Sequence, residues 1–249
     1  MHSTRSVIIF VLVMTTLVAV VLAGLSTVLA PTIKKNELLY AKKSTLSAIS
    51  NHLGDVKFAS ISDDQVENIF AERVKQMVVD MNGNVLNDAD VEALGYVGGK
   101  AENVDILKEM RKPEEERVLP LFIYTKPSGE NYYIVATTGK GLWDVIWGCI
   151  AFEEDLNTIA GVSFDHKAET PGLGAEIKDN TAWVKQFIGK KMYDKDGDYK
   201  SVYVRKGGAR GELYEVDGIS GATITGDGVS EMLKRGVKYY EPFFKTIKG

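Results

Sequence analysis

An uncharged run of about 28 residues between Arg5 and Lys34 constrains the fold more than any other feature of this sequence. At 1.5 Å per residue, a helix over this run exceeds the roughly 20 residues needed to cross a bilayer. A cleavable signal peptide is the alternative, and Val21-Leu22-Ala23 resembles a cleavage site. However, the run is far longer than the usual apolar core of about 7–15 residues in such peptides. The sequence therefore predicts a retained, single-pass transmembrane helix over residues 6–33.

The membrane orientation is left open by the flanking charges. Arg5 lies on one side of the run, and four lysines lie on the other: Lys34, Lys35, Lys42 and Lys43. A simple count of positive charges places the large domain in the cytoplasm, but long domains cross a membrane largely regardless of charge.

Charge and cysteine content exclude several function classes. The net charge of the 249 residues is −4, and Lys and Arg are interspersed with acidic residues, which predicts no nucleic-acid partner. Cys149 is the only cysteine, so the chain by itself forms no intrachain disulfide, no cysteine-ligated iron–sulfur cluster and no Cys-rich zinc site.

Hydrophobic periodicity predicts an α+β domain with a largely antiparallel sheet and flanking helices, because the strands follow one another more than they alternate with helices. Residues 34–118 are expected to form a helical or mixed membrane-proximal region, and residues 119–249 the main domain. The expected helices cover residues 36–53, 63–73, 181–188 and 228–239. The expected strands cover residues 74–80, 119–124, 132–138, 145–152, 158–164, 202–205 and 213–216, with a hairpin turn at Met81–Asn84.

The stretch from Asp217 to Thr225 reads Asp-Gly-Ile-Ser-Gly-Ala-Thr-Ile-Thr and is followed by a helical pattern. Its small residues let a backbone approach a ligand closely, and an anion on Thr225 would lie near a helix N-terminus, which favours a phosphate. The alternative is an ordinary turn in which Ser, Thr or Asp227 caps the helix.

Two further segments contain candidate ligand-binding residues. Residues 166–174 read His-Lys-Ala-Glu-Thr-Pro-Gly-Leu-Gly, and residues 139–144 read Gly-Lys-Gly-Leu-Trp-Asp. Without a third ligand, His166 and Glu169 do not predict a metal site. The Gly-x-Gly at Gly139 lacks the third glycine of a dinucleotide-binding fingerprint. Residues 194–198 look like a calcium loop, but Arg205 stands where the bidentate Glu is needed.

Residues 217–225 resemble, position for position, the D-x-x-[ST]-G-A-T-x-[ST] signature of a family of proteins that carry covalently bound FMN. In that family the flavin phosphate is esterified to the last hydroxyl residue, which implies Thr225 here. Thr223, two positions earlier, is a weaker candidate. The segments at 139–144 and 166–174 are similar to the G-x-G-L-W and H-x-x-E-T-P-G-L-G segments of the same family.

The resemblance implies that residues 119–249 form the FMN-binding domain. The residues that it implies at the cofactor are Ser220, Gly221, Ala222, Thr223, Ile224, Thr225, Glu169, Thr170, Gly172, Leu173, Gly141, Leu142 and Trp143; it implies no catalytic residue and no metal ligand.

Taken over the anchor and the three segments, the chain resembles the C-subunit family of sodium-translocating NADH:quinone oxidoreductases. That family implies a flavoprotein of the bacterial inner membrane, with the flavin domain on the periplasmic side. It would relay electrons from NADH toward quinone in a complex that transports sodium ions. The partners implied are the other membrane subunits, the lipid bilayer and a flavin transferase that attaches FMN. No nicotinamide-binding motif is present, so the isolated chain is not expected to complete the reaction.

Two alternatives stay open at this point. The G subunit of the Rnf ion-translocating electron-transport complex has the same anchor and flavin signature, but the charged region over residues 53–117 favours the sodium-pump family. A membrane-anchored flavin-binding redox sensor is the other, although such proteins usually carry additional transmembrane or signalling segments.

Overall fold

The structure, a computed structural model, describes residues 3–54 and 56–248. These residues divide after Tyr40 into two compact units. The helix α1 (Thr4–Ser47) makes up the described part of the first unit and contributes its last residues to the second.

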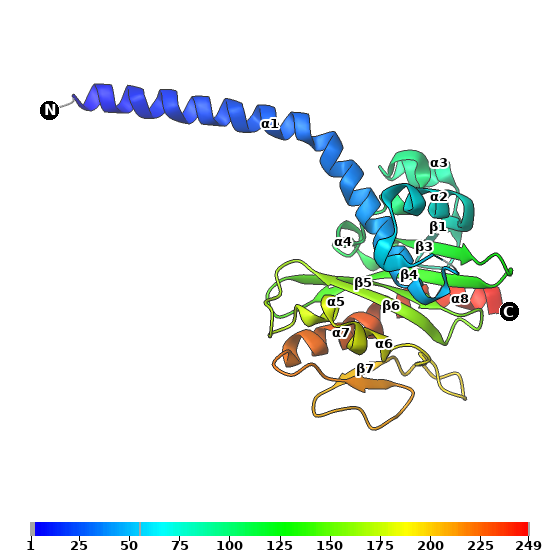
Figure 1. The fold of residues 1–249 in the computed structure, drawn as a ribbon. Coiled ribbons are helices and arrows are strands. Elements are labelled where there is room, and N and C mark those ends of the chain that lie inside the picture. The colour runs from blue at the N-terminus through cyan, green and yellow to red at the C-terminus, as the bar shows by residue number, and fades with distance from the viewer. Residues whose placement is uncertain (1–2, 55, 249) are drawn as a thin grey trace. The chain divides into compact units, whose positions relative to one another are not determined.

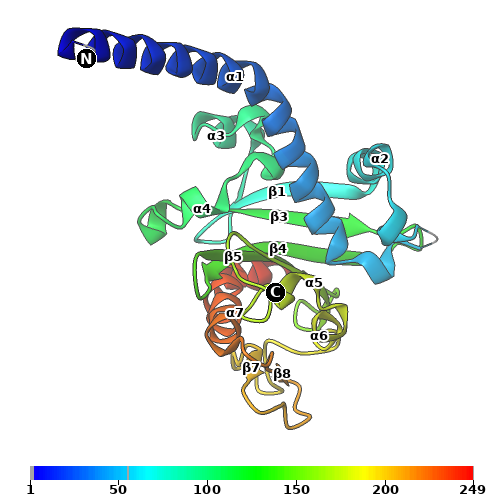
Figure 2. The same cartoon turned by 60° about the vertical axis from the view of Figure 1, so that its left-hand side comes forward.

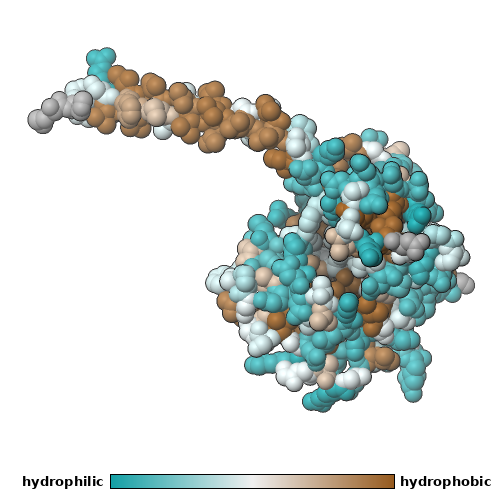
Figure 3. Space-filling view, viewed as in Figure 1, coloured by the Kyte–Doolittle hydropathy of each residue, from teal (hydrophilic) through white to brown (hydrophobic). Residues whose placement is uncertain are grey.

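The first unit is an exposed apolar helix (Figure 3). It contains the one helix in the described part of the chain that is long and apolar enough to cross a membrane. Two of its hydroxyls bond within the helix: Thr15 and Thr27 donate to the carbonyls of Val11 and Ala23 at 2.9 Å. Such back-bonding gives these two hydroxyl donors a partner within the helix itself.

The second unit contains a six-stranded antiparallel sheet in the order β2-β1-β3-β4-β5-β6 (Figures 1 and 2). The strands are β1 (Val74–Asp80), β2 (Val85–Leu86), β3 (Val118–Thr125), β4 (Asn131–Lys140), β5 (Val145–Phe152) and β6 (Ile159–His166). A separate parallel pair consists of β7 (Tyr203–Arg205) and β8 (Glu215–Asp217). The predicted α+β class with a largely antiparallel sheet is confirmed.

Helices and short 3₁₀ turns surround the sheet. The α-helices after α1 are α2 (Asp63–Arg73), α3 (Asp88–Ala93), α4 (Ile106–Glu109), α5 (Glu176–Asp179), α6 (Thr181–Lys185), α7 (Thr223–Gly236) and α8 (Glu241–Lys248). The 3₁₀ turns are η1 (Ser50–His52), η2 (Phe58–Ser60), η3 (Val97–Gly99), η4 (Ala101–Asn103), η5 (Glu114–Glu116) and η6 (Lys238–Tyr240).

The sheet is covered on both faces. On one face, the hydroxyl of Ser163 on β6 donates to the carbonyl of Ser44 near the end of α1 at 2.8 Å. On the other face, Gly236 of α7 packs against Thr137 of β4. Ser163 pairs with Cys149, whereas Thr137 pairs with Gly148, the adjacent residue of β5. Because successive strand residues point to opposite faces, the two helical segments lie on opposite sides of the sheet.

Most element bounds follow the sequence pattern, with two informative differences. The predicted helices and strands at 63–73, 74–80 and 145–152 have the same bounds in the structure. The helix expected over 36–53 instead ends at Ser47 and is followed by a 3₁₀ turn.

The second difference concerns α7, which begins at Thr223 and not at the expected Gly228. Gly226 and Gly228 are poor helix formers, so their pattern indicated a turn. In the structure they are helical because they allow close packing. A Cβ on Gly228 would collide with the carbonyl of Lys140, and one on Gly226 would lie 3.0 Å from Val204. Tertiary contact therefore overrides the helix propensity, and Thr225 lies inside the first turn of α7.

Candidate flavin site

Three segments that are distant in the sequence meet at the start of α7. The first is the β4–β5 loop, residues 141–144; the second is the stretch after β6, residues 167–175; the third leads from β8 into the first turn of α7, residues 218–225. The structure thus brings together the three segments that the sequence singled out.

Thr225 forms the centre of this arrangement. Its side chain is fully buried, and its hydroxyl donates to Glu169 Oε2 at 2.7 Å, with the carbonyl of Leu173 as a second acceptor at 3.3 Å. Thr223, by contrast, is exposed at the first position of the helix. The hydroxyl of Thr225 is therefore held in one orientation by a carboxylate and a carbonyl from a single loop.

Glu169 is only 5% exposed and is surrounded by donors. Its Oε1 accepts from the backbone N–H groups of Trp143 at 2.9 Å and Asp144 at 3.4 Å, and its Oε2 accepts from Leu142 N–H at 3.3 Å. Burial by itself raises the pKa of Glu169, but the hydrogen bonds from Trp143 and Thr225, with those from Asp144 and Leu142, outweigh it and hold the pKa below 4.5. Glu169 is therefore ionised at neutral pH and acts only as an acceptor.

Two glycines make this close approach possible. A Cβ on Gly141 would lie 2.5 Å from Glu169 Oε1. A Cβ on Gly174 would overlap Thr225 Oγ1 and lie 2.8 Å from Glu169 Oε2, and Gly174 also has a φ of +147°. Any larger residue at either position would push the carboxylate away from its donors.

The turn at residues 170–176, called the Pro171 turn below, covers Thr225. Leu173 N–H donates to the carbonyl of Thr170 at 2.9 Å, and the N–H groups of Gly172 and Gly174 donate to the carboxylate of Glu176. These backbone N–H groups, that of Gly172 foremost, hold the pKa of Glu176 below its usual value. The Pro171 turn therefore has its own carboxylate and does not depend on Glu169 for its shape.

Each of the three segments also carries an exposed apolar side chain. Trp143 is 63% exposed, Leu173 41% and Ile224 58%. Exposed large apolar residues brought together from separate segments are typical of a ligand or partner site. The remaining residues that the sequence singled out vary in exposure: Ala222 and Gly141 are buried, Leu142 is half-buried, and Ser220, Gly221, Thr170 and Gly172 are exposed.

The start of α7 adds backbone donors. By their position, the first N–H groups of this 14-residue helix have no intrahelical partner, and its N-cap residue Ala222 supplies no side-chain cap. The first intrahelical bond runs from Gly226 N–H to the carbonyl of Ala222 at 2.9 Å. Unpaired N–H groups and the helix dipole favour a phosphate beside Thr225.

Two residues that hold the site together lie outside the set implied by the sequence. Asp144 contributes a backbone N–H to Glu169, and Gly174 provides the space between Glu169 and Thr225. A cavity of about 550 Å³ adjoins the turn before α7 and extends to residues 206–208 and Asp227. The Lys206-Gly207-Gly208 run was the only sequence signal for this cavity, and it resembles an ordinary connecting loop.

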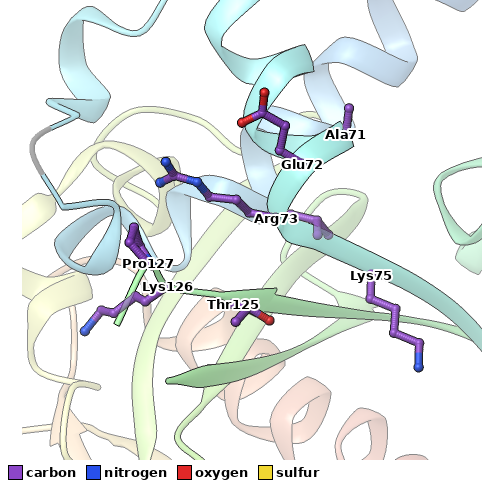
Figure 4. A pocket seen from close by; sticks show the side chains of 8 residues that line it. Ala71, Glu72, Arg73, Lys75, Thr125, Lys126 and Pro127 are labelled. Atoms are coloured by element: carbon purple, nitrogen blue, oxygen red, sulfur yellow. The ribbon is translucent and has the colours of Figure 1, made fainter. Parts of the chain in front are cut away.

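Another large pocket of the surface is not lined by the three segments that meet at Thr225. A pocket of about 530 Å³ lies where α2 meets β1, beside the β3–β4 turn, and its lining comes from none of the three segments. Figure 4 shows the Lys75 side chain of this pocket pointing away from Lys126. Within residues 3–54 and 56–248, no group of three or more His, Cys, Asp and Glu side chains is placed to hold a metal ion.

Comparison with known proteins agrees with this geometry. Residues 141–238, from the β4–β5 loop to just beyond α7, match the model of the FMN-binding domain family. The C subunit of the Na(+)-translocating NADH-quinone reductase of Pseudomonas aeruginosa is 32% identical over 244 residues, which cover 93% of this chain and 90% of that protein. Its counterpart in Neisseria meningitidis serogroup A is 29% identical, covering 99% and 95%.

Solved structures give the same result. The crystal structure of the C subunit of this reductase from Parabacteroides distasonis matches with a TM-score of 0.71 and 34% identity, covering 87% of this chain and 96% of that one. NqrC from Shewanella oneidensis matches with a TM-score of 0.66 and 29% identity, covering 83% and 98%. The chain therefore belongs to the C-subunit family of the Na(+)-translocating NADH-quinone reductase, and it contains an FMN-binding domain.

Proposed function

We propose that this chain is a membrane-anchored electron-transfer subunit in which FMN is esterified through its phosphate to Thr225. The observation that carries the proposal is the position of the Thr225 hydroxyl. It lies in the first turn of α7, where three segments with exposed apolar side chains converge.

The residues present fit a phosphate ester at Thr225. Its hydroxyl is fixed by two acceptors, and the unpaired N–H groups of the first helical turn lie on the same segment of backbone. Thr223 has no hydrogen bond of this kind among those of the described residues, so Thr225 is the better acceptor. Because Thr225 is buried under the Pro171 turn, attachment requires that turn to move aside.

The ring of the flavin would contact Trp143, Leu173 and Ile224, which are exposed apolar side chains of the segments that meet at Thr225. Because Gly172 and Gly221 have no side chains, their backbone atoms would be accessible to the flavin. The other residues that we expect near it are Ser220, Thr170 and Leu142. FMN, when bound, would be the electron carrier, because a flavin accepts and releases electrons singly or in pairs. The chain's own residues fix its position and exclude water from its phosphate end.

The family and the exposed apolar helix of the first unit support a membrane anchor and partner subunits. The exposed apolar helix would lie in the lipid bilayer over residues 6–33, and residues 34–118 would form the membrane-proximal region before the flavin-carrying residues 119–249. The other membrane subunits of the reductase would supply NADH oxidation and quinone reduction. A periplasmic flavin domain and a separate flavin transferase complete the proposal.

The test is covalent loading of the chain in cells. The full chain is co-expressed with a flavin transferase, denatured completely, and examined by in-gel flavin fluorescence and intact mass. We expect one FMN on the wild type and on Thr223→Ala, and none on Thr225→Ala. If the wild type carries no flavin after denaturation although the transferase is active on another acceptor, the covalent proposal is wrong.

A further inference from the structure

We propose that Glu169 is the proton acceptor that prepares Thr225 for its modification, so that the acceptor protein supplies part of the chemistry of its own flavin attachment. This inference rests on the proposed function, because it concerns how the phosphoester at Thr225 forms.

The hydroxyl proton of Thr225 is directed at Glu169 before any reaction begins. Thr225 Oγ1 lies 2.7 Å from Glu169 Oε2 and 3.3 Å from the carbonyl of Leu173. A hydroxyl has one proton, and the shorter bond to the charged acceptor is the stronger one. The Thr225 proton therefore points at Glu169, and the lone pairs of Oγ1 are left for an incoming phosphorus.

Glu169 is held independently of the cover over Thr225. Its carboxylate is fixed by the N–H groups of residues 142–144, and its own backbone N–H donates to Nδ1 of His166 at 3.1 Å. The Pro171 turn is organised instead by Glu176. The turn can therefore swing away from Thr225 while Glu169 stays in contact with the hydroxyl.

No other titratable side chain competes for the Thr225 proton among the hydrogen bonds of the described residues. The charged groups around Glu169 are engaged elsewhere: Asp144 pairs with Lys167 at 2.9 Å, Nδ1 of His166 accepts from a backbone N–H, and Glu176 accepts from Gly172 and Gly174. Asp227 follows Thr225 on α7 and is exposed. Glu169 is thus the only carboxylate among the described residues that touches the reacting oxygen.

The step balances with a co-reactant of one chemical class, a phosphoanhydride of FMN with a nucleoside monophosphate as leaving group. A bond forms between Thr225 Oγ1 and the flavin phosphorus, and the anhydride P–O bond breaks. The electron pair of that bond leaves with the nucleoside monophosphate, the hydroxyl proton moves to Glu169, and no atom is oxidised or reduced. The neutral carboxyl group then avoids repulsion with the single negative charge of the new phosphodiester. Glu169 later releases its proton to water.

A general base of this kind contributes about 10²–10⁴-fold to a rate. The experiment uses the full chain in detergent with a purified flavin transferase and its flavin dinucleotide donor, and follows the initial rate of mass gain from pH 6 to 9. The variant is Glu169→Gln, and the matched control is Glu176→Gln, which alters a carboxylate of the same region that does not touch Thr225.

We expect Glu169→Gln to load about 10²–10⁴-fold more slowly than the wild type at pH 6. The ratio of wild-type to variant rates should fall as the pH rises, because a threonine without a base depends on hydroxide. The pH dependence of the transferase itself cancels in this ratio. Glu176→Gln should keep a rate ratio that does not change with pH.

Two results would overturn the inference: a Glu169→Gln rate within about threefold of the wild type, or a slow rate whose ratio to the wild type is the same at every pH. If Glu169→Gln does not fold, Glu169→Asp decides, since it keeps a carboxylate. Its loading should be slower, with a pH-independent ratio to the wild type; a ratio that falls with pH would contradict the role of a base. A wild type that gains no mass at all would contradict the proposed function itself, so the two failures are distinguishable.

Discussion

The hydroxyl of Thr225 donates a 2.7 Å hydrogen bond to Glu169, which lies 56 residues earlier in the chain. This one contact joins the stretch after β6 to the first turn of α7, and through the N–H groups that hold Glu169 it also joins the β4–β5 loop. The three segments therefore form one structural unit, and a change in any of them should be felt at the hydroxyl.

Gly174→Ala should disrupt this unit most directly. The added Cβ would overlap Thr225 Oγ1, and the φ of +147° is unfavourable for alanine, so we expect a loss of about 2–4 kcal/mol in the free energy of unfolding. Covalent flavin loading should fall at least about tenfold, because the hydroxyl is displaced from Glu169. Urea unfolding and intact mass measure the two effects.

The control for this change is Gly129→Ala in the β3–β4 turn. Gly129 also has a positive φ of +96°, but an added Cβ there would meet nothing within 4 Å. Strain alone should cost about 1 kcal/mol and leave flavin loading unchanged. Equal loading of the Gly174 and Gly129 variants would show that the space beside Thr225 is not needed.

Glu169→Gln should lower stability in a pH-dependent way. The amide cannot accept from all the N–H groups that face Glu169, which should cost about 1–3 kcal/mol at pH 7. The folded-state pKa lies below 4.5, so the carboxylate stabilises the fold at pH above 4.5, and that contribution is lost as the pH falls through the folded pKa. The difference between wild type and variant should therefore be constant from pH 6 to 8 and shrink below pH 4.5.

The measurement is urea unfolding of the flavin-free protein between pH 3 and 8. The control is Glu72→Gln, an exposed residue at the end of α2. It should change the stability by less than about 0.5 kcal/mol at each pH. A Glu169→Gln difference that grows in acid would mean that folding raises the pKa of Glu169 instead of lowering it.

Much of this architecture could be predicted from the sequence because strand patterns are local. The β-branched residues of 74–80 and the apolar run of 145–152, each followed by a turn, predicted the bounds of β1 and β5 to the residue, and the signature residues singled out Thr225. The start of α7 could not be predicted, because Gly226 and Gly228 are helical only through their contacts with Val204 and Lys140. Long-range packing, which a single sequence does not display, decides that boundary.

The sequence predicted some features of the site, and others became visible only in the folded structure. Glu169 was identified as a residue near the cofactor, but its contact with Thr225 depends on how β6 and α7 meet. The roles of Gly141 and Gly174 likewise follow from the atoms that a Cβ would strike. Sequence patterns thus predicted which segments meet at the site. Which donor bonds to which acceptor could be read only from the structure.

Substitution of two tryptophans should have very different effects on the free energy of unfolding. Trp183 is 3% exposed, packs against Phe164 and Phe187, and donates from Nε1 to the carbonyl of Asp217 at 2.6 Å. Trp183→Ala should cost about 3–5 kcal/mol. Trp143→Ala, at an exposed position of the β4–β5 loop, should change the stability of the flavin-free protein by less than about 0.5 kcal/mol.

Trp143 should matter only once flavin is attached. Because an indole near the ring quenches flavin emission, we expect Trp143→Ala to raise the fluorescence of the loaded, folded protein, with no change after denaturation. Emission spectra of native and denatured samples at equal flavin content provide the comparison. Unchanged native emission would remove Trp143 from the ring environment while leaving the site at Thr225 intact.

The two compact units should respond differently to substitutions along α1. Leu46 is fully buried in the second unit, so Leu46→Ala should cost about 2–5 kcal/mol of its unfolding free energy. Leu12, an exposed leucine of the same helix, should give no change in that unfolding transition when replaced by alanine. A chain that begins at Ala41 should stay in solution after membranes are sedimented and still accept flavin at Thr225, whereas the full chain should remain with the membranes through an alkaline wash. If the shortened chain instead sediments with the membranes, an apolar surface of the second unit, and not residues 6–33, provides the attachment.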